Sequence, residues 1–243
     1  MTNHLLTRAR AWADADPHAG DRAEIEALIE AENVEELSRR FSGPMTFGTA
    51  GLRGPLRAGP AGMNAAVVTR AASGLGRYLT EDGHAGAGIV VGFDARRRSD
   101  EFAHVTAAVL TRAGFAVQVL PKALPTPVLS FAVRHLGCAA GVMVTASHNP
   151  PDDNGYKVYL GDGAQLVPPA DRLIESAIAT SAPTRDASAF SRSVAPGSSG
   201  LGNATVGKAG SGSSCWATVT GGASPAAANT ARVVSAPTPC IAV

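Results

Sequence analysis

Three short runs of apolar, β-branched-rich sequence alternate with helix-like stretches in the middle of this 243-residue chain. The runs are GIVVGF at 88–93, FAVQVL at 115–120 and AAGVMVT at 139–145. Strands that alternate with helices along a chain favour a parallel sheet, with the connecting helices on its two faces. The sequence therefore predicts an α/β fold with a mixed, mostly parallel sheet sandwiched by helices.

Other segments of the first 180 residues complete this picture. A fourth run, GYKVYL at 155–160, follows a tight turn, so we expect a strand antiparallel to its neighbour. Apolar spacing predicts helix over most of 21–41, and the glycine-rich stretch 42–63 indicates a loop. Asn64 is a suitable N-cap for the next helix, and a last helix is expected to start near Pro168.

The composition changes near residue 180. Of the 63 residues from 181 to 243, 44 are Ala, Ser, Gly, Thr or Pro, with a single Leu and a single Ile. Such a segment cannot bury enough apolar surface to offset an ordering entropy of about 1–2 kcal/mol per residue. The sequence thus predicts an N-terminal helical extension (1–44), an α/β domain (45–180) and a disordered tail (181–243). One hypothesis for the tail is a GC-rich gene read out of frame.

Net charge, hydropathy and cysteine content exclude several classes of protein. The formal net charge of +1 argues against a protein that binds nucleic acid or a membrane surface. No apolar run is long enough to span a membrane, and the N-terminus lacks the pattern of a signal peptide. Three scattered cysteines do not suggest a disulfide partner or a CxxC metal site. We therefore expect a cytoplasmic protein.

The segment VMVTASHNPPDDNGYKVY, residues 142–159, places polar groups where an α/β sheet binds ligands. Ser147 directly follows a buried strand, and two prolines stiffen the loop. His148 is not expected to share a proton with Ser147, because neighbours in an extended chain point to opposite sides. A serine that carries a phosphoryl group fits better, because it needs cations and hydrogen-bond donors around it rather than one base, and Lys157 comes ten residues later on a short strand. The alternative is a turn built by Ser147, Asn149 and the prolines.

Two further loops supply cationic side chains. In TFGTAGLRGPL, residues 46–56, glycines flank Arg53, so the backbone can approach a phosphate and the guanidinium can bind it with two hydrogen bonds. In VGFDARRRSDEF, residues 91–102, Asp94 and Arg96 follow a strand end. The alternatives are a flexible loop with a solvated arginine and a solvated basic turn before a helix.

In this order, FGTAGLRG, VGFDARRRS, TASHNPP and NGYKVY resemble the motifs of the α-D-phosphohexomutases, the phosphoglucomutase and phosphomannomutase enzymes. The resemblance covers roughly residues 4–178, and the GDGAQLVPP stretch is similar to the branch near the phosphopentomutases. It implies that residues 45–180 are the first of four domains. The family moves a phosphoryl group within a sugar phosphate, through a phosphoserine and a sugar bisphosphate.

The resemblance also implies roles for individual residues. Ser147 would be the phosphoserine and, through its phosphate, a ligand of Mg²⁺. His148 and Lys157 would be the acid/base and transition-state groups. The side chains implied for contacting the phosphoryl group or shaping the site beside it are Arg53, Asp94 and Arg96.

The chain departs from the family pattern in its metal site. The string DGDxDR is absent, GDG at 161–163 is only a turn, and the sugar-selecting and phosphate-binding loops of the later domains are missing. We therefore expect the remaining Mg²⁺ ligands to be absent and Mg²⁺ binding to be weak or absent. The predicted function is phosphohexomutase-type phosphoryl transfer on sugar phosphates. The alternative is a truncated, inactive fragment that at most binds phosphate or is phosphorylated on Ser147.

Overall fold

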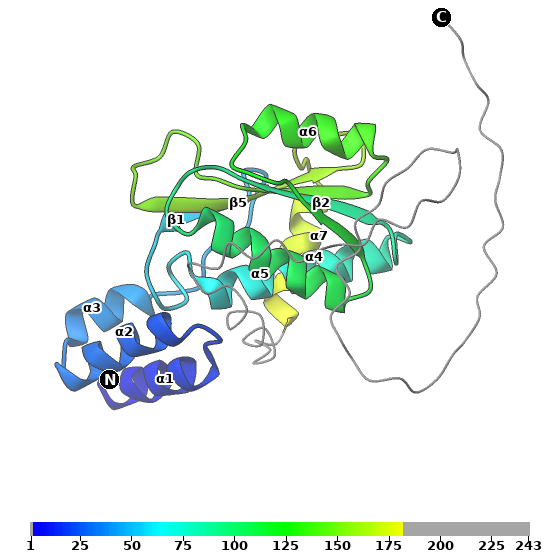
Figure 1. The fold of residues 1–243 in the computed structure, drawn as a ribbon. Helices are drawn as coiled ribbons and strands as arrows, with labels where there is room; N and C mark the ends of the chain where they lie inside the picture. Colours follow the sequence, from blue (N-terminus) through cyan, green and yellow to red (C-terminus); the bar gives the residue numbers. More distant parts are fainter. Residues whose placement is uncertain (1, 182–243) are drawn as a thin grey trace, which may run out of the picture. The chain divides into compact units, whose positions relative to one another are not determined.

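The structure is a computed structural model and describes residues 2–181 (Figure 1). Apart from Ser181, the tail predicted to be disordered lies outside the described residues. No helix within residues 2–181 is both long and apolar enough to cross a membrane. The elements are, in chain order, α1 (Thr2–Ala15), α2 (Ala19–Glu30), α3 (Val34–Arg40), β1 (Leu52–Pro55), α4 (Ala65–Glu81), β2 (Gly88–Phe93), α5 (Ser99–Arg112), β3 (Ala116–Val119), α6 (Thr126–His135), β4 (Ala140–Val144), β5 (Asp153–Leu160) and α7 (Ala170–Thr180).

The five strands form one mixed sheet in the order β1-β5-β4-β2-β3. Strand β2 pairs in parallel with β3 and with β4, whereas β5 pairs antiparallel with β4 and with β1. Four of the five strands therefore point in the same direction, and β5 alone among them runs the other way. The predicted fold class and the antiparallel fourth run are confirmed.

Helices cover both faces of this sheet (Figure 1). Helices α4, α5 and α7 lie on one face, and α6 lies on the other. Alternate residues of each strand enter the two cores: Val91 and Val142 pack with Phe102 on the first face, and Met143 packs with Leu129 on the second. This period of two is what a strand buried on both faces requires.

Two segments differ from the sequence prediction. The stretch 21–41 is two helices, α2 and α3, because Glu32 has a φ of 49° and Asn33 accepts a hydrogen bond from the amide of Glu36, capping a new helix. The stretch 42–63 is not only a loop, because it contains the edge strand β1. Strand β1 forms by pairing with β5, about 100 residues later, so no local pattern announces it.

The N-terminal helices pack around an apolar cluster of their own. Its buried members are Ala9, Ala13, Ile25, Leu37 and Phe41 from α1 to α3 and the loop after them, together with Ala58. Helix α1 contacts both α2 and α3. The boundaries drawn at residues 44 and 180 stay predictions.

The close approach of α4 and α7 depends on Gly74. A Cβ atom there would lie 2.4 Å from Cγ1 and 2.7 Å from Cα of Ile178. We expect Gly74→Ala to lower the free energy of unfolding by about 1–3 kcal/mol, the usual cost of overpacking, as measured by urea denaturation. Gly76→Ala in the same helix is the control, because its Cβ would meet only side-chain atoms, at 3.3 Å and beyond. Equal effects of the two substitutions would contradict this packing.

Candidate active site

Two loops meet at one edge of the sheet, where β2 and β4 end. We call residues 94–98 the arginine loop and residues 145–152 the serine loop; they follow β2 and β4 directly. The amide of Asp94 donates a hydrogen bond to the carbonyl of Val144 at 3.2 Å, so the loops start side by side. Because parallel neighbours end at the same edge, their loops form the usual ligand-binding side of an α/β sheet.

Ser147 lies in the serine loop with its side chain against a buried lysine. The ammonium nitrogen of Lys157, on the neighbouring strand β5, donates a hydrogen bond to Ser147 Oγ at 2.7 Å. Lys157 is 7% exposed, whereas Ser147 is exposed. Burial lowers the pKa of Lys157, the charge of Arg53 lowers it further, and Asp94 acts in the opposite direction. The serine hydroxyl therefore faces a cation that is poorly solvated.

The carboxylate of Asp94 connects the two loops. Its Oδ2 accepts a hydrogen bond from Thr145 Oγ1 at 2.6 Å, and its Oδ1 accepts from Ser99 Oγ at 2.7 Å and from the amide of Arg96 at 3.1 Å. Thr145 Oγ1 in turn accepts from the amide of Ser147 at 2.9 Å. A chain of hydrogen bonds thus runs from the start of α5 through Asp94 to the backbone of Ser147.

Arg96 holds the serine loop by its carbonyl oxygens. One guanidinium nitrogen donates to the carbonyls of Pro150 and Asp153, at 2.7 and 3.1 Å, and the other donates to those of Ser147 and Asn149, at 2.6 and 2.9 Å. The planar guanidinium suits this arrangement because its donors have fixed directions. Arg96 therefore fixes the backbone at Ser147 and in the six residues that follow it.

Arg53 lies on β1, opposite Gly155 of β5, to whose carbonyl the amide of Thr145 donates a hydrogen bond. Its Nε is buried and has no hydrogen-bond partner among the described residues. The turn before it needs Gly51, which has a φ of 75° and whose Cβ would lie 1.9 Å from the carbonyl oxygen of Tyr156. This close contact places the glycine-rich loop directly against β5, next to Lys157.

The structure thus brings most of the predicted site residues together. Ser147, Lys157, Asp94 and Arg96 form one hydrogen-bonded network, and Arg53 lies beside Lys157 closely enough to affect its pKa. His148 lies on the serine loop, where it is exposed and outside this network.

A comparison with known families agrees with this arrangement. Residues 44–185, more than half of the chain, match the family model described as phosphoglucomutase/phosphomannomutase, alpha/beta/alpha domain I. The chain belongs to this family. The domain I match covers both loops and all six predicted site residues.

This member of the phosphoglucomutase/phosphomannomutase family is also similar to individual proteins, each over part of its length. The chain is 43% identical over 169 residues to a protein of Schizosaccharomyces pombe named "Probable phosphoribomutase", covering 69% of this chain and 29% of that protein. It is 39% identical over 186 residues to a mouse phosphopentomutase, covering 73% and 30%. A crystal structure from Thermus thermophilus, named "putative phosphomannomutase", has a TM-score of 0.52 and 40% identity, covering 56% of this chain and 30% of that one. The chain therefore spans about three tenths of the length of these relatives.

Sequence reasoning missed three polar side chains of the network. Thr145 links Asp94 to the backbone amide of Ser147. Ser99 accepts a hydrogen bond from the buried side-chain amide of Asn154 at 3.0 Å. The same side-chain amide also donates to the carbonyl of Arg97 at 2.9 Å. Only their position in the sequence could have pointed to these residues, since Thr145 and Ser99 each lie within five residues of a predicted site residue. From the sequence, Ser99 marks only the start of a helix.

Only one of the three consecutive arginines fits the solvated basic turn that the sequence offered as an alternative. Arg97 fits it, with a side chain that is 71% exposed and paired with Asp152. Arg96 and Arg98 do not, because their side chains are only 15% and 20% exposed and bind specific partners. Adjacent residues at the start of a helix face different ways, which is why identical residue types have different roles here.

The carboxylates near Ser147 are the natural candidates for Mg²⁺ ligands. Both oxygens of Asp94 accept hydrogen bonds, Asp152 pairs with Arg97, and Asp153 accepts from the side-chain amide of Asn149 at 2.9 Å. Within residues 2–181, no three or more His, Cys, Asp or Glu side chains are grouped so that they could hold a metal ion. The described residues do not fit a Mg²⁺ site by themselves.

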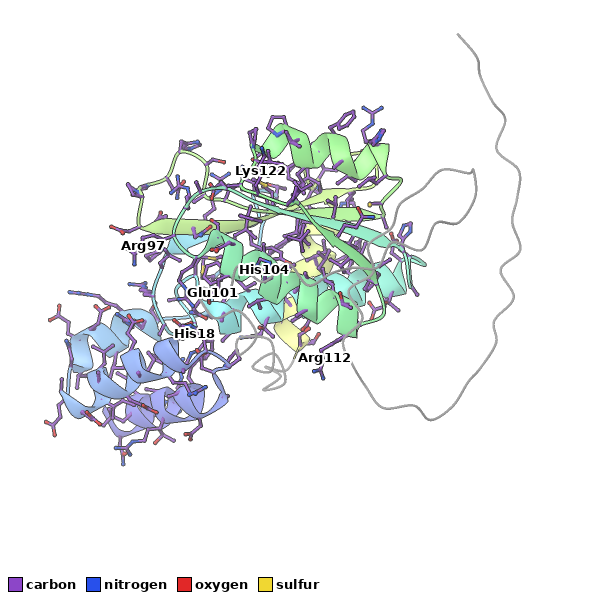
Figure 2. The ribbon with its side chains drawn as sticks, in the orientation of Figure 1. His18, Arg97, Glu101, His104, Arg112 and Lys122 are labelled. Atoms are coloured by element: carbon purple, nitrogen blue, oxygen red, sulfur yellow. The ribbon has the colours of Figure 1, made fainter. Side chains whose placement is uncertain are left out.

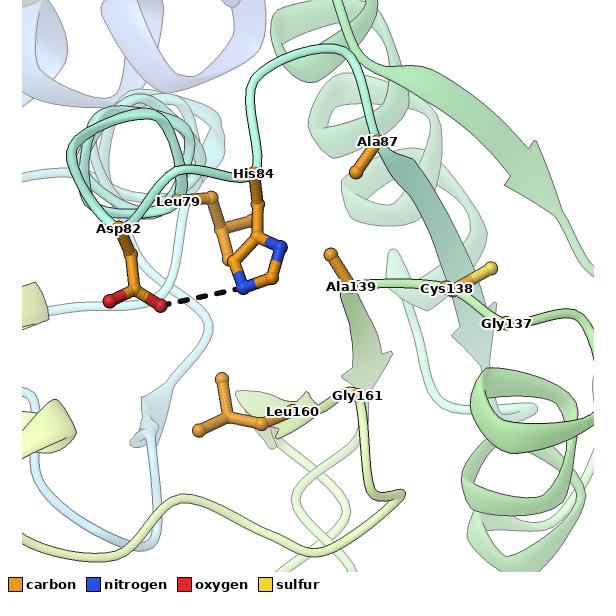
Figure 3. Close-up of a pocket in the computed structure, with 9 residues that line it drawn as sticks. All are labelled: Leu79, Asp82, His84, Ala87, Gly137, Cys138, Ala139, Leu160 and Gly161. Carbon is orange, nitrogen blue, oxygen red and sulfur yellow. Dashed lines mark ion pairs between the residues drawn. The ribbon is translucent and has the colours of Figure 1, made fainter.

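A cavity of about 310 Å³ lies at the other end of the strands (Figure 3). It opens where β2 and β4 begin and β5 ends, and its lining includes Cys138 and the ion pair of His84 with Asp82, 3.5 Å apart. Cys138 is buried and free, and burial raises the pKa of its thiol. Because Ser147 follows the opposite end of β4, this cavity is separate from the candidate site.

The role of Arg96 can be tested against its neighbour. Lysine keeps the charge of Arg96 but lacks the planar set of donors that reaches four carbonyls. We expect Arg96→Lys to lower the free energy of unfolding by about 1–3 kcal/mol and to speed hydrogen exchange of the amides of residues 147–149, 152 and 153. Arg97→Lys is the matched control, and its exposed ion pair should change stability by less than about 1 kcal/mol. Equal exchange rates in the two variants would contradict the proposed role of Arg96 in holding the serine loop.

Proposed function

We propose that this chain provides the phosphoserine-bearing domain of a sugar-phosphate mutase, in which Ser147 Oγ accepts and donates the phosphoryl group. The observation that carries the proposal is the 2.7 Å hydrogen bond from the buried Lys157 ammonium to this oxygen, in a loop clamped by Arg96. Membership of the phosphoglucomutase/phosphomannomutase family supports it. Relatives named for mutases of ribose and pentose phosphates support a sugar phosphate as the substrate.

The proposed transfer has two halves. In the first, the bond between phosphorus and Ser147 Oγ breaks as a hydroxyl oxygen of the sugar phosphate bonds to the same phosphorus, giving a sugar bisphosphate. Lys157 hydrogen-bonds to the departing Oγ, stabilises its negative charge and gives it a proton. The sugar hydroxyl passes its proton to His148, which we propose as the base because it is exposed beside Ser147. In the second half, the other phosphoryl group of the bisphosphate returns to Oγ, and the protons move back.

The charges of the site suit a phosphoryl group. Phosphoserine carries about −1.5 to −2 charges at neutral pH, so it needs cations and hydrogen-bond donors around it. Lys157 lies at Oγ, and Arg53, whose Nε lacks a partner within the described residues, lies next to Lys157. We propose that Arg53 donates to the phosphoryl oxygens. Phosphoryl transfer depends mostly on such positioning and charge neutralisation.

We further propose that this chain binds Mg²⁺ weakly. The carboxylates nearest to Ser147 already accept hydrogen bonds or pair with arginines, and Mg²⁺ dehydrates reluctantly unless carboxylates anchor it. The second candidate function follows from this: a domain that is phosphorylated on Ser147 but does not convert substrate by itself.

Phosphoryl uptake tests the proposal directly. We expect the 243-residue protein to incorporate label from ³²P-labelled glucose 1,6-bisphosphate on Ser147, as located by peptide mass spectrometry. Ser147→Ala should abolish uptake, and Arg53→Ala should slow it by about 10²-fold, the cost of losing one charge-stabilising donor. Ser42→Ala, at another exposed serine, should leave it unchanged. Persistent labelling of Ser147→Ala would refute the assignment.

A coupled assay on the same protein separates the two candidate functions. Glucose 1-phosphate, a trace of glucose 1,6-bisphosphate and Mg²⁺ are supplied, and glucose 6-phosphate is measured. Labelling without conversion supports the phosphate-accepting domain. Robust Mg²⁺-dependent conversion supports a mutase that is complete in this chain.

Lys157 is expected to favour catalysis at the expense of stability. Because its pKa is lowered, the folded protein binds fewer protons than the unfolded chain between the two pKa values, so stability rises with pH through that range. We expect Lys157→Met to remove this rise, to leave the free energy of unfolding at pH 7 equal or higher, and to slow labelling of Ser147 by at least about 10²-fold. Urea denaturation at several pH values and the labelling rate measure the two effects. A large loss of stability at pH 7 would contradict this role.

A further inference from the structure

A buried carboxylate joins the N-terminal helices to the arginine loop. Asp21 of α2 is 2% exposed, and its two oxygens accept hydrogen bonds from the guanidinium of Arg98 at 2.7 and 2.9 Å. Asp21 Oδ2 also accepts from the amide of Ala65, the first residue of α4, at 3.3 Å. Figure 2 shows His18 and Glu101 at this junction, and Glu101 is a second acceptor for Arg98.

The pair is ionised at neutral pH. Burial by itself would raise the pKa of Asp21, but hydrogen bonds from His18 and Arg98 outweigh burial and lower this pKa to about 2. Arg98 lies between Asp21 and Glu101 and also stacks over the ring of Phe102, 4.9 Å from its centroid. Such a partly buried and doubly paired guanidinium is held in one place.

Arg98 has an unusual backbone. Its φ is 61° and its ψ is 8°, a left-handed conformation that is unfavourable for a residue with a Cβ atom. The residues on both sides are part of the site network: the carbonyl of Arg97 accepts from Asn154, and Ser99 Oγ donates to Asp94. The turn at Arg98 therefore determines where Ser99 meets Asp94.

We propose that Arg98, held by Asp21, is a positioning residue for the serine loop. Its ion pair keeps the backbone left-handed, which directs Ser99 Oγ to Asp94; Asp94 then holds Thr145, and Thr145 holds the amide of Ser147. The N-terminal helices thereby influence the site through Asp21. The effect on phosphoryl transfer rests on the proposed function, whereas the effect on the loop's structure does not.

Two substitutions of Arg98 separate this role from simple anchoring. Arg98→Ala and Arg98→Gly lose the same contacts with Asp21, Glu101 and Phe102. Only glycine adopts the left-handed conformation at no steric cost. Two measurements are made on the full 243-residue protein: the amide chemical shifts of Ser147 and Thr145 by NMR, and the rate of Ser147 labelling by glucose 1,6-bisphosphate.

We expect Arg98→Ala to shift both amides and to slow labelling about tenfold, and Arg98→Gly to restore the shifts and to label within about threefold of the unsubstituted protein. Equal effects of alanine and glycine, or unshifted amides in both variants, would overturn the proposal. If the unsubstituted protein takes up no label, the proposed function fails, and the NMR comparison still decides this inference.

Asp21→Asn provides a second test should Arg98→Ala fail to fold. It should shift the Ser147 amide when Arg98 is present, and it should add no further shift when combined with Arg98→Gly. Glu24→Gln is the matched control, because Glu24 also links the N-terminal helices to the domain, by accepting a hydrogen bond from the amide of Ala58, but does not touch the arginine loop. An equal shift of the Ser147 amide in Glu24→Gln would contradict the proposal.

Discussion

The carboxylate of Asp94 joins the ends of two neighbouring parallel strands, and the geometry around Ser147 depends on it. Strand β2 delivers Asp94 and strand β4 delivers Thr145, whose hydroxyl donates to Asp94 at 2.6 Å. Loops after strands are otherwise free to move, because backbone pairing ends with the strand. A carboxylate that accepts from Thr145, Ser99 and the amide of Arg96 gives these two loops a common reference point.

Different side chains hold the serine loop in place and remain available to bind a ligand. Arg96 uses its guanidinium on four carbonyl oxygens, so these backbone acceptors are satisfied within the protein. Ser147 is exposed and its hydroxyl accepts a hydrogen bond from Lys157, and the buried Nε of Arg53 has no partner among the described residues. Cations close to a serine suit the phosphoryl group that we propose as the occupant.

Most of the fold could be predicted because its signals are local. Apolar runs identified β2 to β5, and side-chain capping identified the start of α4, where Asn64 accepts from the amide of Val67 at 3.0 Å. The edge strand β1 was missed because its four residues form a strand only by pairing with β5. The break at Glu32 was missed because a positive φ at a glutamate leaves no mark in the apolar spacing.

The candidate site divides in the same way. The sequence by itself determined the residue types and the loops that carry them: a serine after a buried strand, an arginine between glycines, and an Asp and Arg after another strand. Only the tertiary structure decided that Lys157 meets Ser147, that Arg96 binds the serine loop, and that Arg98 binds Asp21, 77 residues away. The physical reason is that burial and the direction of a side chain depend on which strands pair and which helices cover them. Three adjacent arginines look alike in sequence, and only packing makes one exposed and the other two partners of different segments.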